Sequence, residues 1–188
     1  MRFVQEVLKE RGKQLGETLL QKIFFLTTFT LINEESNEVK ADLEKTLKQL
    51  LLLELRDGRP VSYVSTATKW SEGDHPAHLA LSSRLAALMA EQGFVAATVG
   101  VVKHLLLKLG DDDNGAVLLP AKCNTLDALS QLVKVCEGKN KDDRKAIALV
   151  DDRQDELANL LLHPQEHLRA KVMELITVSL DRLDLLPK

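Results

Sequence analysis

The stretch TLDALSQLVKVC (residues 125–136) decides the fold, because its apolar residues recur at helical spacing. Steps of three and four residues place side chains on one face of an α-helix. The residues concerned are Leu126, Leu129, Leu132, Val133 and Cys136. Most other segments share this period, and the closest approach to a strand, VSYVSTAT (residues 61–68), would have no partner strand. The sequence therefore predicts an all-α protein.

The leucine pattern of this stretch recurs at a period of 44 residues, which indicates an internal repeat. The counterparts of Leu129, Leu132 and Val133 are Leu85, Leu88 and Met89 on one side (129 − 85) and Met173, Ile176 and Thr177 on the other (173 − 129). We expect Leu85, Leu88, Met173 and Ile176 to share one core with the opening stretch.

A fourth long helix fits the same register after one insertion. Its residues lie 107 before their counterparts (126 − 19), and they are Leu19, Phe25, Leu26, Phe29 and Asn33. The surplus over two periods is 19 residues (107 − 88), and it falls where helical patterning fails, in RDGRPVSYVSTATKWSEGDHP (residues 56–76). The sequence thus predicts long helices that begin near Gly16, His75, Gly115 and Gln165, with an inserted loop at 56–76.

Shorter apolar helices are predicted between the long ones, over residues 44–55, 101–109, 142–149 and 153–162. In NKDDRKAIALVDDRQDELANLLLHPQEHLRAKVMELITVSL (residues 140–180), two short helices precede a long one, and this order resembles armadillo-type repeats. The resemblance implies a right-handed superhelical stack of armadillo-like helical repeats, an α-solenoid, forming a single domain over residues 1–188. HEAT-like helix pairs remain an alternative. The Trp and Asn ladder by which armadillo repeats hold basic import signals is absent, since Asp127 and Gln131 occupy those positions.

Composition limits the classes of function. The net charge is −3 and aromatic residues make up 4%, so neither nucleic acid nor an anionic membrane is an expected partner. No apolar run approaches the ~20 residues that cross a bilayer. The two cysteines match no metal or redox spacing. We therefore expect a cytoplasmic or nuclear protein.

Polar clusters offer no convincing metal or catalytic site. The acidic run at residues 111–115 fails the EF-hand pattern, because placing Gly115 at its sixth position puts Gly110 and Ala121 at the ligand positions that end the loop. It is better explained as a bend and cap before a helix. His163 and His167 are four apart, but Pro164 places the first of them before a helix. The sequence predicts no metal, no cofactor and no enzymatic activity.

A stack of helices builds a long surface that suits protein partners. We expect a non-enzymatic scaffold for protein–protein interaction, which binds a peptide or helix of a partner protein on its groove and inserted loop. That loop contains the only tyrosine and the only tryptophan of the chain, residue types common in binding hot spots. The candidate binding residues are Arg56, Arg59, Tyr63, Lys69, Trp70, Asn124 and Gln131. Burial of Trp70 against the stack is the alternative.

A structural fragment of a larger helical-repeat protein is the competing function. Leu180, Leu183 and Leu186 keep helical spacing at the C-terminal end, which looks uncovered. Such an open end would mediate assembly or self-association.

Chelation tests the interpretation of the acidic run. If residues 111–115 form only a bend and cap, EDTA leaves the melting temperature of the protein unchanged. A fall of several degrees, restored by calcium, would show instead that the run holds an ion.

Overall fold

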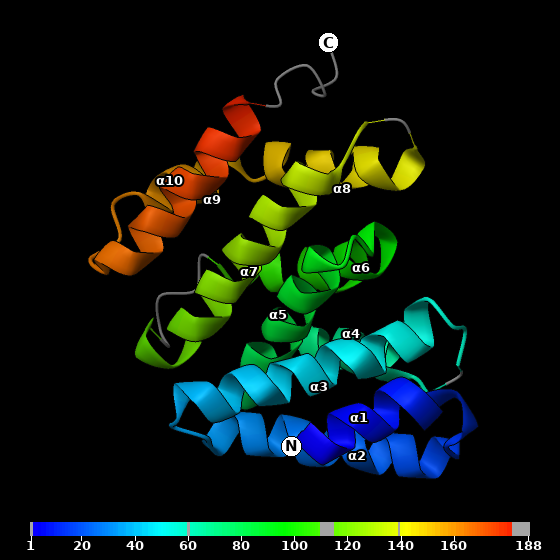
Figure 1. Ribbon diagram of the computed structural model, residues 1–188. Coiled ribbons are helices and arrows are strands. Elements are labelled where there is room, and N and C mark those ends of the chain that lie inside the picture. Colours follow the sequence, from blue (N-terminus) through cyan, green and yellow to red (C-terminus); the bar gives the residue numbers. More distant parts are fainter. Residues whose placement is uncertain (1, 60, 110–114, 139, 182–188) are drawn as a thin grey trace. The chain divides into compact units, whose positions relative to one another are not determined.

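The computed structural model describes residues 2–59, 61–109, 115–138 and 140–181 (Figure 1). These residues form ten α-helices and one 3-10 turn and contain no β-strand, which confirms the all-α prediction. The sequence predicts one domain over residues 1–188. Contacts between Cα atoms divide the chain into two compact units, Met1–Thr66 and Ala67–Lys188.

The first unit is built around α3. It contains α1 (Arg2–Arg11), a 3-10 turn (Gly12–Gln14), α2 (Glu17–Asn33), α3 (Asn37–Leu55) and the start of α4 (Tyr63–Glu72). Both α1 and α2 pack against α3. The turn after α1 approaches α3 closely at Gly12, where a Cβ atom would lie 2.9 Å from Leu53 Cδ1. Only glycine allows this approach without displacing the leucine.

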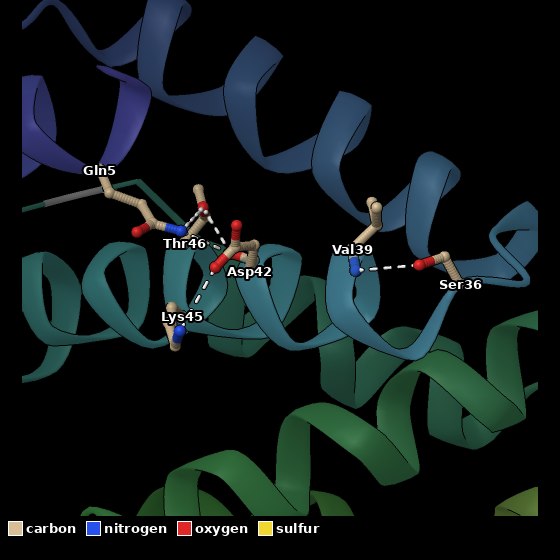
Figure 2. A network of polar contacts seen from close by, with 6 residues as sticks. All are labelled: Gln5, Ser36, Val39, Asp42, Lys45 and Thr46. Atoms are coloured by element: carbon tan, nitrogen blue, oxygen red, sulfur yellow. Dashed lines mark hydrogen bonds and ion pairs between the residues drawn. The ribbon is translucent and has the colours of Figure 1, made fainter. Parts of the chain in front are cut away.

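Polar contacts fix α1 on α3 and set where α3 begins (Figure 2). Gln5 on α1 donates its amide to the backbone oxygen of Asp42, at 2.7 Å, and to Thr46 Oγ1, at 3.4 Å. Ser36 caps α3 by accepting a hydrogen bond from the backbone N–H of Val39. A serine at this position satisfies an otherwise unpaired N–H group. The helix expected over residues 44–55 is therefore longer, because it starts at this cap.

The second unit is built around α7 (Gly115–Val135). Its other helices are the rest of α4, α5 (Pro76–Glu91), α6 (Val95–Leu106), α8 (Lys141–Asp151), α9 (Gln154–Leu160) and α10 (Glu166–Leu180). Helix α7 packs against α5, α6, α8 and α10, and Figure 1 shows it between α5 and α10. One core cluster joins Leu132 of α7, and Cys136 directly after it, to Ala90 of α5 and to Ala146 and Ile147 of α8.

The predicted starts of the four long helices are confirmed. Gly16, His75 and Gln165 are the N-cap residues of α2, α5 and α10, and α7 begins at Gly115. Pro76 follows the cap of α5, where its missing N–H and fixed φ suit a helix start. Residues 111–114, which hold the acidic run, and the leucines at 183 and 186 lie outside the described residues.

The prediction that residues 56–76 form a loop is wrong, because they contain α4. Tyr63, Ala67 and Ser71 are buried at four-residue steps and form one helical face. Glu54 of α3 accepts the backbone N–H of Val64 at 3.0 Å and so satisfies a donor in the first turn. The apolar signal of this helix is weak because the face is made partly of alanine and serine.

The 44-residue repeat predicted the buried residues of α5 and α7 correctly, but not those of α2 and α10. Leu85 and Leu88 on α5, Leu129 and Leu132 on α7, and Cys136 directly after α7 are buried as predicted. On α10 the buried residues are instead Leu168, Val172 and Leu175. On α2 they are Leu20, Phe24, Thr27 and Thr28. Both helices carry apolar residues on more than one face, so leucine spacing alone does not select the buried side.

Truncation in α10 tests the corrected register. Leu175→Ala removes a fully buried side chain and is expected to lower the free energy of unfolding by about 2–5 kcal/mol. Met173→Ala is the matched control: this side chain is 53% exposed, so the expected loss is below about 1 kcal/mol. Urea unfolding followed by circular dichroism measures both. Equal losses, or a larger loss for Met173→Ala, would restore the register read from the sequence.

Candidate functional site

Two of the predicted binding residues in the first unit are arginines with internal partners. The Arg56 guanidinium lies 3.0 Å from a carboxylate oxygen of Asp57, and this hydrogen bond lowers the pKa of that carboxyl. Arg59 donates to the backbone oxygen of Leu15 at 2.5 Å and so holds the segment before α2. Arg56 remains exposed and Arg59 is half-buried. Their role in binding a partner stays a prediction.

Tyr63 belongs to the core, which corrects its assignment to a binding surface. Its side chain is 1% exposed, and its ring stacks on Phe24 with centroids 4.5 Å apart. The phenol hydroxyl has no hydrogen-bond partner among the described residues. Burial raises the pKa of Tyr63 well above its ordinary value, and the nearby charge of Glu54 raises it further. This ring holds the start of α4 to the first unit.

The remaining predicted residues lie in the second unit, on α4 and α7. Lys69 is exposed. Trp70 is half-buried and stacks on His78 of α5, with ring centroids 5.4 Å apart, so the covering role considered as the alternative has structural support. Asn124 donates to Ser83 Oγ at 3.4 Å, and Gln131 is half-buried. These contacts lie within the unit, and they leave the predicted role in binding untested.

Charged residues between α7 and α10 form a structural network. Lys171 Nζ lies 2.7 Å from Asp127 Oδ1, and Lys134 Nζ lies 3.1 Å from Glu174 Oε1. The hydrogen bond to Asp127 raises the pKa of Lys171, and the hydrogen bond from Lys134 lowers the pKa of Glu174. Each pair favours the charged forms, so the network ties the two helices together.

His163 and the two cysteines have surroundings within the second unit that the structure describes. His163 precedes α10, as predicted, and its Nδ1 accepts the backbone N–H of Gln165 at 3.2 Å. Cys123 and Cys136 are buried free thiols, and burial raises the pKa of Cys123. In the part of the chain that the structure describes, no three His, Cys, Asp or Glu side chains gather as a metal site would require. The expected lack of metal, cofactor and catalysis stays a prediction.

An apolar groove in the second unit was missed by the sequence analysis. It has a volume of about 360 Å³ and lies among α8, α9 and α10. We call it the C-terminal groove, and it is lined by Val150, Gln154, Leu157, Ala158, Leu161, Leu175, Ile176, Ser179 and Leu180. The Ser179 hydroxyl oxygen has no hydrogen-bond partner among the described residues. The sequence feature that could have predicted this groove is the run LANLLL (residues 157–162), because it has more leucine residues than a two-turn helix can bury.

Acidic residues accompany this groove. Asp151 accepts a hydrogen bond from Gln154, a lining residue, at 2.6 Å. The nearby cation Arg153 is already paired with Glu156 at 2.7 Å. Asp151, Asp155 and Asp181 each adjoin a lining residue in the sequence, and Asp152 follows Asp151. We call these four exposed residues the acidic rim.

Among the described residues, no helix is both long enough and apolar enough to cross a membrane. No family model, curated protein or solved structure matches the chain.

Alkaline titration tests the burial of Tyr63. The folded state raises the pKa of Tyr63 above the ordinary value of 10.0, so tyrosinate absorbance is expected to appear only well above that pH, together with unfolding. The corresponding stability is present below pH 10.0 and is lost as the pH rises further. Tyr63→Phe removes both the ionisation and a buried hydroxyl without a partner, so it is expected to unfold at higher pH than the parent. Titration near 10.0 in the folded protein would place Tyr63 at the surface.

Proposed function

We propose that the chain is a non-enzymatic protein-interaction module whose C-terminal groove receives the apolar face of a partner helix. The observation that supports this proposal is the combination of an apolar groove with an acidic rim. Amphipathic helices bind such grooves by inserting side chains spaced at three, four and seven residues. The groove is a better candidate than the region of residues 56–76, because Tyr63 is in the core.

The chemistry of the groove indicates what kind of helix would bind. Most lining residues are aliphatic, so leucine- or isoleucine-like anchors gain free energy by leaving water. The acidic rim attracts lysine or arginine flanking those anchors and raises the rate of encounter at low salt. The proposed partner segment is therefore a basic amphipathic helix.

An armadillo-like stack remains our proposal for the architecture behind this site. The last three helices have 11, 7 and 15 residues, the order of two short helices and a long one that suggested the resemblance. In a helical-repeat array, the outer face of a terminal repeat is the face that the next repeat would cover. We place such a module in the cytoplasm or nucleus, where the two cysteines stay reduced.

Exposed leucines support a second candidate, assembly through the face that holds the C-terminal groove. Leu180 lines that groove and is 58% exposed, and Leu162, two residues beyond α9, is 85% exposed. Two copies meeting groove to groove would bring their acidic rims together, and like charges at an interface are unfavourable. A basic partner helix is favoured for that reason.

Peptide binding tests the proposed function. The probe is a fluorescent amphipathic helix of leucine and lysine, compared with its leucine–glutamate counterpart by anisotropy. Leu180→Glu puts a charge in the groove and is expected to weaken binding of the basic peptide at least about tenfold. Leu107→Glu is the matched control, since Leu107 is 57% exposed and Leu180 58%, and it lies outside the groove.

The acidic rim provides a second readout. Asp155→Asn combined with Asp181→Asn is expected to reduce both the affinity for the basic peptide and its dependence on salt. Equal affinity of the parent and Leu180→Glu would refute the groove as the binding site. Loss of self-association in Leu180→Glu, without peptide binding by the parent, would favour the second candidate.

A further inference from the structure

Helix α2 is apolar on two opposite faces, although only one of them is buried. Leu20, Phe24, Thr27 and Thr28 form the buried face. The other face is exposed, and we call its residues Leu19, Phe25, Leu26, Phe29 and Ile32 the α2 stripe. Phe29 is 69% exposed, which is unusual for so large an apolar side chain.

The sequence of α2 has the composition of a helix covered on both sides. Residues 23–33 (IFFLTTFTLIN) contain no charged side chain. A helix that is apolar all round is normally buried all round, and contiguous apolar patches mark interaction sites. Beside the stripe, Leu26 also lines a groove of about 230 Å³, together with residues of α1 and α3 (Val4, Val39 and Leu43 among them). The exposed apolar surface thus extends from the stripe to residues of α1 and α3.

The stripe carries one positive charge and is followed by negative charge. Lys22 lies on the stripe, three residues after Leu19 and three before Phe25. Glu34 and Glu35 follow Asn33, the last residue of α2. Lys22 and Glu35 are exposed and take part in no ion pair with the residues that the structure describes. The N-terminal half of the stripe is therefore positive, and the chain just beyond its C-terminal end is negative.

This polarity selects a second copy of the chain in antiparallel orientation. In a two-fold pair, residue i of one copy contacts residue j of the other, and j contacts i. Pairing centred on Thr28 brings Lys22 opposite Glu34 of the other copy, because both are six residues from the centre. The same pairing packs the central residues of each stripe, Phe25, Leu26 and Phe29, on the corresponding part of the other copy. Parallel pairing would place Lys22 beside Lys22 and is disfavoured.

We propose that two copies of the chain dimerise through their α2 stripes in antiparallel orientation. This inference goes beyond the proposed function, because the stripe lies in the first unit and the C-terminal groove in the second. A dimer presents two grooves and so binds a divalent partner with increased avidity.

Sedimentation velocity on the full chain tests the dimer. The parent is expected to sediment with twice the mass of a 20.9 kDa chain at micromolar concentrations. Phe29→Glu introduces a charge at the centre of the stripe and is expected to give a monomer with unchanged helical circular dichroism. Leu107→Glu, an equal change at an exposed leucine on the second unit, is expected to remain dimeric.

Charge reversal tests the antiparallel orientation. Lys22→Glu alone, and Glu34→Lys with Glu35→Lys, are each expected to raise the dissociation constant of the dimer about tenfold through two symmetry-related repulsions. The combined triple variant restores the opposite signs and is expected to dimerise like the parent. A monomeric parent, a dimer that survives Phe29→Glu, or a triple variant weaker than either swap would each overturn the proposal. Peptide binding by the C-terminal groove is measured on the same variants. Its result does not depend on whether the dimer forms, so the two proposals can fail separately.

Discussion

The second unit depends on the burial of α7 from several sides. Leu126, Ala128, Leu129, Leu132 and Val133 lie on the wide apolar side of the helix, and all of them are buried. The opposite side stays partly exposed and carries polar residues at three- and four-residue steps, namely Asn124, Asp127, Gln131 and Lys134. Helix α7 therefore needs cover over most of its circumference, and α5, α6, α8 and α10 pack against it. Its buried Thr125 hydroxyl is satisfied within the helix, by the backbone oxygen of Ala121 at 2.7 Å. The arrangement of the surrounding helices follows from this one requirement.

The two candidate surfaces arise where that requirement is not met. Helix α2 carries apolar residues on two opposite faces, but within the described residues its stripe remains exposed. At the other end of the chain, α9 has only seven residues, too few to cover the leucines of α8 and α10. Both surfaces therefore exist because these helices have more apolar surface than their own unit buries. A partner helix or a second copy would supply the missing cover.

Local sequence signals predicted helix existence and starts, but they did not predict which side of each helix is buried. Pro76 and the glycine at position 16 mark helix starts through backbone conformation, so the prediction held there. Helix α4 was missed because Val64, Thr66 and Thr68 are β-branched and resemble a strand. Val172 is buried while Met173 is exposed, and neighbouring apolar residues of this kind are distinguished only by tertiary packing. The C-terminal groove depends on the same packing, since three helices contribute to it.

Helix α4 carries both the only tyrosine and the only tryptophan of the chain, seven residues apart. The boundary between the two compact units falls between them, after Thr66. Tyr63 is packed on Phe24 in the first unit, and Trp70 is stacked on His78 in the second. The chain thus carries one intrinsic optical reporter in each unit. Tryptophan emission follows the melting of the second unit and tyrosine absorbance that of the first, so the cooperativity between them is measurable without any added label.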